Sequence, residues 1–376
     1  MKATLPVWWL HLVITSVVLG QSPAAIRTDR LERIDRVVEE GIHRKQMPGC
    51  VVVIGSRNEI YFEKAYGQRQ LQPEPVPMTL ATVFDLASLT KPIATGTSIM
   101  QLAEHGKIDL TASVSTYLPE FTGSGKEKIT VTQLLTHQGG LIPDNALADY
   151  QRGRKIAYQK INELTLRAEP GTEFIYSDVS FIVLGELVER ITGQRLDEYA
   201  QEQIFKPLQM ADSGYLPGAQ LRERAAPTQE REDRWMRGEV HDPRAYEMDG
   251  VAGHAGLFST AADLTRFARM ILNRGKLDGV QVLDSKTVEQ ITAPVTVSGG
   301  VRSLGWDKQT GYSSNKGDLL SDQAIGHGGF TGTGLWIDPE LDLFIIFLSN
   351  RVHPDGSGSV NSLIGRIATI SAAALP

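Results

Sequence analysis

The pattern of hydrophobic and polar residues predicts a helix and then a β-hairpin in the first part of the chain. Apolar residues recur at helical spacing over residues 31–42, and Asp29 stands where a capping side chain is expected. Residues 50–54 and 59–66 are strand-like runs separated by a Gly-Ser-Arg-Asn segment, which is a hairpin signal. We therefore expect a helix that leads into two paired strands.

The middle of the chain has a helical pattern, and strands return near its end. Residues 89–320 are mainly helical in pattern, and residues 179–191 and 262–272 are the clearest helices. Residues 333–337 and 343–348 are predicted to be strands around an Asp-Pro-Glu-Leu turn.

Strands at both ends with helices between them predict one sheet that is built from both ends of the chain. The folded part is expected to cover residues 26–376, with the sheet drawn from about residues 48–87 and 300–376. A helical region, about residues 88–299, would be inserted between the two halves, and a last helix is predicted over residues 360–373.

The N-terminal segment has the composition of a secretory signal peptide. Lys2 supplies a positive charge, and residues 7–19 are mostly apolar but fall short of the about 20 apolar residues that span a bilayer. Cleavage near Gly20 would remove residues 1–20 and leave a secreted or periplasmic protein without stable membrane insertion. The alternative is an uncleaved membrane anchor.

The composition and charge of the chain argue against several classes of protein, binding partner and cofactor. Of the 376 residues, 41% are hydrophobic and 22% charged, as in an ordinary globular protein. The net charge of −6, without a long run of one sign, argues against nucleic acid as a partner. The single cysteine, Cys50, excludes an intramolecular disulfide and a multi-cysteine metal site. The sequence has no dinucleotide-binding, P-loop or zinc-protease motif, so we expect no cofactor.

A serine and a lysine three residues apart carry the first candidate chemistry. This spacing occurs at Ser88 and Lys91 and again at Ser313 and Lys316. Ser88 precedes a helical pattern, whereas Ser313 stands among Gly, Ser and Asn, where a solvated turn is expected. A helix N-terminus favours the negative charge that forms when a serine attacks a carbonyl. The alternative is a serine N-cap followed by a solvated lysine.

A tyrosine provides the second candidate element. Tyr176 and Asp178 form the single Tyr-x-Asp or Tyr-x-Asn of the chain, just before the helix predicted from residue 179. Tyr176 can exchange a proton with a serine if Lys91 stabilises its phenolate. Otherwise it is a half-buried tyrosine, with Asp178 as the N-cap of the helix.

A histidine followed by two glycines provides the third element. His327, Gly328 and Gly329 precede a predicted strand, where glycines would let a substrate backbone approach closely. The backbone N–H of Phe330 would complete an oxyanion hole with that of Ser88.

In this order the three elements resemble the motifs of the penicillin-recognising serine hydrolases, which include class C β-lactamases, low-molecular-weight penicillin-binding proteins and related esterases. In this family the motifs follow in the order S-x-x-K, Y-x-N and K-T-G or H-x-G. Residues 134–137 and 204–208 also resemble segments of family members. The resemblance covers nearly the whole chain from Asp29 onward. It implies an α+β fold, in which an antiparallel β-sheet is flanked by helices and an all-helical domain is inserted, with the site in the cleft between them.

The chain departs from the family pattern in its second and third motifs. Asp178 replaces an asparagine, and its negative charge would keep Lys91 protonated and leave Tyr176 as the better proton acceptor. His327 replaces the lysine that many members carry, so a fixed cation becomes a group that titrates at about pH 6.5.

Two residues after the last strand offer compensation. Asn350 and Arg351 would restore recognition of a substrate carboxylate that the lysine otherwise binds.

A narrower resemblance lies in residues 241–243 and 250–259. They look like a subgroup of cell-wall enzymes that includes exo-acting N-acetylmuramyl-L-alanine amidases and certain periplasmic penicillin-binding proteins. His254 would either reach substrate from the rim of the cleft or hold a tight loop through backbone hydrogen bonds. A metal bound by His241, Asp242 and His254 is the weakest interpretation, and we expect none.

Together, these interpretations predict that the protein is a secreted serine hydrolase that works through a Ser88 acyl-enzyme. Tyr176 and Lys91 would pass the proton to the leaving group, and backbone N–H groups of Ser88 and Phe330 would hold the oxyanion. Cell-wall peptide or muropeptide amides would be the substrates, with esterase side activity. The alternatives are a β-lactamase or general carboxylesterase, and a catalytically silent penicillin-binding-like protein.

Overall fold

The computed structural model describes residue 1 and residues 26–376. The predicted signal peptide therefore lies almost entirely outside the described residues. Within the described part of the chain, no helix is both long enough and apolar enough to cross a membrane.

A large antiparallel sheet joins the two ends of the chain. Within residues 26–376 nine strands pair in the order β10-β11-β12-β13-β14-β15-β1-β2-β3, and every neighbouring pair is antiparallel. The N-terminal strands are β1 (Gly49–Gly55), β2 (Ile60–Gln70) and β3 (Val76–Pro77). The others are β10 (Val295–Val297), β11 (Gly300–Arg302), β12 (Asp307–Gln309), β13 (Ile325–Gly329), β14 (Thr333–Asp338) and β15 (Leu343–Ser349). The predicted hairpin, the C-terminal strands and the α+β fold class are confirmed.

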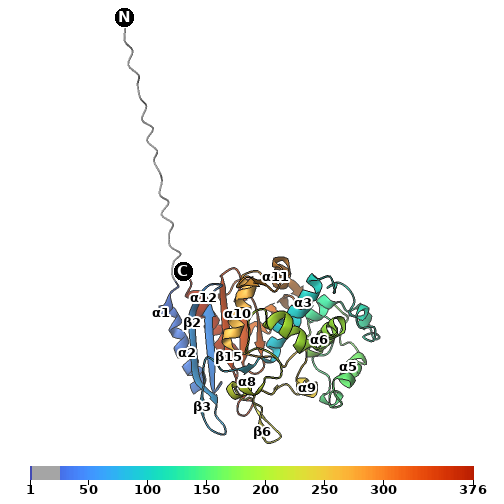
Figure 1. Cartoon of the computed structure of the whole chain (residues 1–376), viewed down its shortest axis with the longest axis horizontal. Helices are drawn as coiled ribbons and strands as arrows, with labels where there is room; N and C mark the ends of the chain where they lie inside the picture. Colours follow the sequence, from blue (N-terminus) through green and yellow to red (C-terminus); the bar gives the residue numbers. More distant parts are fainter. Residues whose placement is uncertain (2–25) are drawn as a thin grey trace.

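Helices cover both faces of this sheet, which explains why β1 is hydrophobic throughout. Cys50, Val52 and Ile54 pack into one core, while Val51 and Val53 point into the other. The first core lies under α1 (Thr28–Leu31), α2 (Arg33–His43) and α12 (Asn361–Ala373), and the second lies under α10 (Ala261–Leu272). Figure 1 shows this arrangement, with β1 beside β15 although they lie far apart in sequence.

The N-terminal helical segment departs from prediction in one respect. It is split into α1 and α2 at Glu32, and Asp29 lies inside the first turn of α1, where it pairs with Arg27 at 3.1 Å. Arg27 precedes the helix and makes no side-chain capping bond. The predicted cap at Asp29 is therefore wrong.

Helices and short strands fill the middle of the chain. The helices are α3 (Thr97–Glu104), α4 (Val131–Leu135), α5 (Arg154–Asn162), α6 (Asp178–Thr192), α7 (Leu196–Ala200), α8 (Ala219–Arg224), α9 (Pro243–Glu247) and α11 (Ser285–Thr292). The short strands are β4 (Phe84–Asp85), β5 (Glu230–Arg231), β6 (Arg234–Trp235), β7 (Phe258–Ser259), β8 (Lys276–Leu277) and β9 (Val280–Gln281). The helices predicted over residues 179–191 and 262–272 are confirmed as α6 and α10.

The central helix α6 holds a loop that later forms part of the site. Its residues from Val179 to Val188 are all buried. A Cβ on Gly253 would lie 1.9 Å from the carbonyl oxygen of Phe181, so only glycine lets the loop pack this closely against α6. This contact fixes the neighbouring residue, His254.

Candidate active site

Ser88 lies on a sharp turn between a strand and a helix. The strand β4 ends at Asp85, Ala87 takes a left-handed conformation (φ 45°), and Ser88 follows in a single 3₁₀ turn. A wide helical turn over Lys91–Gly96 then continues into α3. The left-handed residue is unfavourable for a side chain with a Cβ, so its neighbours must hold it in place.

Asp85 provides this hold. The buried carboxylate accepts hydrogen bonds from the backbone N–H of Ala87 at 2.8 Å and of His241 at 2.7 Å. Burial raises the pKa of Asp85 to about 6, although the two N–H groups act in the opposite direction. The sequence carries a signal for this role, because Asp85 is the single charge in the apolar run of residues 83–87.

Lys91 is completely buried, and its ammonium meets three acceptors. Nζ donates to Ser88 Oγ at 2.9 Å and to the carbonyl oxygen of His254 at 3.2 Å, and it pairs with Asp178 Oδ1 at 2.7 Å. Burial acts to lower the pKa of Lys91, but Asp178 and Tyr176 more than offset this and hold it above its ordinary value. The alternative of a solvated lysine is wrong, and Lys91 stays protonated.

Tyr176 is fixed in a stack of rings beside Lys91. The Lys91 ammonium lies 5.1 Å from the Tyr176 ring centroid. The ring centroids of His137 and Tyr312 lie 4.5 and 4.8 Å from that of Tyr176. His137 in turn accepts a hydrogen bond from the backbone N–H of Ser177 at 3.0 Å. The ring can therefore move little relative to Lys91.

Asp178 does not cap α6. Ser177 performs this task, because its Oγ accepts a hydrogen bond from the N–H of Ser180 at 3.1 Å. The capping alternative is therefore wrong for Asp178, and its carboxylate is free to face Lys91.

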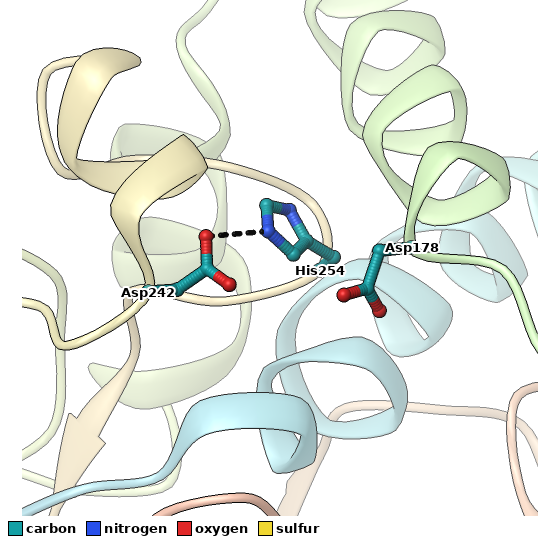
Figure 2. Close-up of side chains that lie close together, drawn as sticks. All are labelled: Asp178, Asp242 and His254. Atoms are coloured by element: carbon teal, nitrogen blue, oxygen red, sulfur yellow. Dashed lines mark hydrogen bonds and ion pairs between the residues drawn. The ribbon is translucent and has the colours of Figure 1, made fainter. Parts of the chain in front are cut away.

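A histidine and a second carboxylate lie behind Asp178 (Figure 2). His254 is 1% exposed, and its Nε2 lies 3.0 Å from Asp242 Oδ1. His254 cannot reach substrate from the cleft rim, so that prediction is wrong. Its backbone carbonyl accepts a hydrogen bond from Lys91, and its ring pairs with a carboxylate and not, as the alternative expected, with the backbone of its loop.

The same three side chains could be considered as metal ligands. One ligand atom each from Asp178, Asp242 and His254 lies within 4.8 Å of the others. His241 is not part of this group, because its Nε2 forms a hydrogen bond with Gln229 Oε1. The ammonium of Lys91, however, already neutralises Asp178, and a divalent ion beside it would meet its repulsion. The arrangement fits a hydrogen-bonded polar network in which the Lys91 ammonium is the counter-ion of Asp178.

His327 is a buried, neutral histidine. Burial lowers the pKa of His327 well below its ordinary value, and the charges of Arg302 and Lys91 act in the same direction. Its Nδ1 donates to the carbonyl oxygen of Gly328 at 2.7 Å, which leaves Nε2 as an acceptor. The expectation of a cation that titrates in the physiological range is wrong.

The glycines after His327 allow two backbone segments to touch. Gly328 and Gly329 end strand β13 and, as predicted, precede the next strand, β14. A Cβ on Gly329 would lie 2.4 Å from the carbonyl oxygen of Leu86, and Thr331 Oγ1 donates to the carbonyl oxygen of Asp85 at 2.7 Å. The close approach is therefore to the serine turn, and it brings the backbone of Phe330 beside that turn.

These elements enclose a cavity of about 340 Å³. Its wall is formed by Ser88, Tyr176, Arg302, Asp307, Tyr312, Asn315, His327, Gly328, Gly329, Phe330, Arg351, Gly358, Ser359, Val360 and Asn361. Asn350 is absent from it, because its amide donates to the carbonyl oxygens of Arg69 and Pro227 at 2.7 and 2.8 Å. The predicted role of Asn350 is therefore wrong, whereas Arg351 lies where substrate could contact it.

Sequence reasoning missed several residues of the cavity wall. Arg302 and Tyr312 carried no recognised motif, and Asn315 was assigned to a solvated turn. Asn315 and Lys316 are in fact buried, and Asn315 accepts a hydrogen bond from Trp336 Nε1 at 3.2 Å. The predicted turn is present over Ser313–Asn315 and exposes Ser314, but the expectation that it is solvated is wrong for Asn315 and Lys316.

The chain matches known proteins over nearly its whole length. A family model described as Beta-lactamase matches residues 34–368. The N-acetylmuramyl-L-alanine amidase of Bacillus subtilis (strain 168) is 34% identical over 91% of this chain and 85% of the relative. A protein of Escherichia coli (strain K12), provisionally named D-alanyl-D-alanine carboxypeptidase, is 32% identical over 88% of this chain and 84% of its own.

Solved structures agree on the fold. A penicillin-binding protein homologue from Caulobacter crescentus aligns with a TM-score of 0.73 at 19% identity, covering 94% of this chain and 100% of its own. A family VIII carboxylesterase aligns with a TM-score of 0.72 at 20% identity, with the same coverage. The chain belongs to the Beta-lactamase family, as the resemblance of its three motifs indicated.

Proposed function

We propose that this protein is a secreted serine hydrolase that cleaves amide bonds of cell-wall peptides or muropeptides through an acyl-enzyme on Ser88. The observation that carries the proposal is the hydrogen bond of 2.9 Å from the buried Lys91 ammonium to Ser88 Oγ, at the wall of a substrate-sized cavity. The proposal of secretion rests on the signal-peptide composition of residues 1–20.

The proposed reaction uses Tyr176 as the proton acceptor. Ser88 Oγ bonds to the substrate carbonyl carbon, and its proton passes to the phenolate oxygen of Tyr176, whose ring centroid lies 5.1 Å from the Lys91 ammonium. Tyr176 then gives this proton to the amine as the C–N bond breaks. Water attacks the resulting ester by the reverse proton path and releases the acid. Backbone N–H groups of Ser88 and Phe330 would hold the oxyanion in both steps.

The substrate class rests on two curated relatives that match nearly the whole chain. Both of these relatives are named for the hydrolysis of amide bonds, one at the muramyl end and one at the D-alanine end of a peptide. The neutral His327 favours a second candidate, a carboxylesterase, because no fixed cation stands at that position to select charged substrates. A β-lactamase remains the weaker alternative.

Product analysis tests the proposal. Mass spectrometry after incubation with N-acetylmuramyl-L-alanyl-D-isoglutamine, a D-alanyl-D-alanine peptide, a p-nitrophenyl ester and a penicillin identifies which bond is broken. We expect amide cleavage in at least one of the two peptides. Ester cleavage alone would support the esterase, penicillin hydrolysis alone the β-lactamase, and binding without turnover the silent binding protein.

Asp178→Asn is expected to move the alkaline limb of activity to lower pH. Without the carboxylate, the largest effect that opposes burial is gone, so Lys91 loses its proton at a lower pH than in the wild type. We expect a displacement of at least about one pH unit, which corresponds to ~1.4 kcal/mol of charge interaction. The measurement is kcat/KM for a neutral p-nitrophenyl ester across the neutral and alkaline range. An identical profile in the variant would contradict the charge role of Asp178.

Asp85→Asn is expected to slow turnover and change the acid limb. An amide can accept from only one of the two N–H groups that Asp85 binds, so kcat should fall about 10-fold or more. Because the pKa of Asp85 is about 6, wild-type kcat should decline as the pH falls through about 6, and this decline should vanish in the variant. Asp233→Asn, at an exposed site, is the control. A persistent decline in Asp85→Asn would assign it to another group.

A further inference from the structure

Arg302 is a buried cation whose hydrogen-bonding capacity is unused. It ends strand β11, its side chain is 0% exposed, and its guanidinium lies 5.4 Å over the ring of Phe174. Among the described residues, no atom accepts a hydrogen bond from its Nε, Nη1 or Nη2. Burying a charge with unused donors is strongly unfavourable, so this group requires a partner.

Asp307 is the carboxylate paired with Arg302, but it is held elsewhere. The distance from Asp307 Oδ1 to Nη1 is 3.5 Å, without hydrogen-bond geometry. Its two oxygens instead accept hydrogen bonds from Thr310 Oγ1 at 2.8 Å and Ser313 Oγ at 2.6 Å. Asp307 therefore neutralises only part of the Arg302 charge, and the N–H donors of the guanidinium have no acceptor among the described residues.

Arg302 belongs to the wall of the cavity that contains Ser88. A guanidinium presents its donors in a planar fork that matches the two oxygens of a carboxylate. We propose that Arg302 is a substrate-binding residue that receives a carboxylate of the substrate as its missing partner. This inference rests on the proposed function, because it assigns Arg302 to substrates of the same site.

Tyr312 gives a carboxylate access to this buried group. Its ring contacts those of Phe174 and Tyr176, with centroids 6.0 and 4.8 Å away, and yet the residue is 55% exposed. Phe174 and Tyr176 are half-buried, so Tyr312 is the member of this cluster that can rotate into solvent. Its rotation would open the cavity wall next to Arg302 and leave the other two rings in place.

A binding comparison tests the proposal without relying on turnover. Calorimetric titration of the Ser88→Ala protein with phenylacetylglycine and with its neutral amide gives two affinities. We expect the acid to bind at least about 10-fold more tightly, as for hydrogen bonds to a charged group. The preference should disappear when Arg302→Met is added and remain in part with Arg302→Lys. Equal affinity for acid and amide, or a preference that survives Arg302→Met, overturns the proposal.

Turnover locates the carboxylate within the substrate. m-Carboxyphenyl phenylacetate carries it on the leaving group and the mono-p-nitrophenyl ester of adipic acid carries it on the acyl group. Phenyl phenylacetate and p-nitrophenyl hexanoate are their neutral partners. In Arg302→Met we expect kcat/KM to fall about 10-fold or more for the anionic ester of one pair, mainly because KM rises. The values of kcat/KM for both neutral esters should stay at the wild-type level.

The controls separate a binding role from a structural one. Equal losses for all four esters, together with a lower melting temperature, would show that Arg302 supports the fold and would overturn the proposal. Arg274→Met removes an exposed cation that pairs with Glu289 and should leave all four rates unchanged. A wild-type protein that hydrolyses neither these esters nor the two peptides would contradict the proposed function, and the titration would still decide the role of Arg302.

Discussion

Ser88→Ala is expected to lower kcat for every substrate by at least about 10⁴-fold, as removal of a nucleophile does in other serine hydrolases. The variant should still fold, because the change removes only one of the three acceptors that Lys91 Nζ meets. The loss of that hydrogen bond should cost only about 1 kcal/mol of stability. The measurements are kcat on the p-nitrophenyl ester and on the muramyl dipeptide, and the melting temperature.

The matched control for Ser88 must be chosen from the structure. Ser313 also stands three residues before a lysine, but its Oγ donates to Asp307 next to Arg302, so its removal would disturb the cavity wall. Ser362→Ala, at an exposed position on α12, is the better control and should keep wild-type rates. Turnover by Ser88→Ala at a rate near that of this control would contradict the proposed mechanism.

Tyr176→Phe is expected to reduce kcat by about 10²- to 10⁴-fold, the range for loss of a positioned proton-transfer group. Phenylalanine keeps the ring between His137 and Tyr312 and removes only the oxygen. The loss should therefore appear in kcat, with little change in KM or in melting temperature. Steady-state kinetics on a neutral ester and on a peptide substrate measure this split.

The outcome of this change distinguishes two candidate bases. Tyr61→Phe, on β2 and outside the cavity wall, should have no effect and serves as the control. If Tyr176→Phe kept wild-type kcat, Lys91 would have to take the proton from Ser88. That would require a neutral lysine, which the adjacent Asp178 opposes.

Much of the fold could be predicted because its determinants are local. The run over β1 and β2 and the spacing in α6 and α10 mark these elements directly in the sequence. Ser88 and Lys91 come together for the same reason, since they lie three positions apart in one helical segment. Tyr176 joined them through the resemblance of its motif, and the structure brings its ring beside Lys91.

The features that prediction missed depend on contacts between distant segments. The burial of Arg302 follows from the pairing of β11 with β10 and β12 and from the contact with Phe174, which is far away in sequence. The pairing of His254 with Asp242 requires the loop at Gly253 to pack on α6. Neither contact leaves a periodic signal in the sequence.

Two errors have a simple physical cause. Asn350 and Arg351 follow the end of β15, where the chain turns, and the Asn350 amide is held by two distant backbone carbonyls, so only Arg351 lines the cavity. His327 was assigned the ordinary pKa of a histidine, whereas its burial beside two cations lowers that pKa and keeps it neutral.

Intact-mass measurement during turnover tests the central claim most directly. The wild-type protein, quenched within the first turnovers of an ester or peptide substrate, should carry one added acyl group, and digestion should locate that group on Ser88. Ser88→Ala should show no added mass under the same conditions. Rapid hydrolysis with no covalent adduct at any quench time, or an adduct on a residue other than Ser88, would contradict the account.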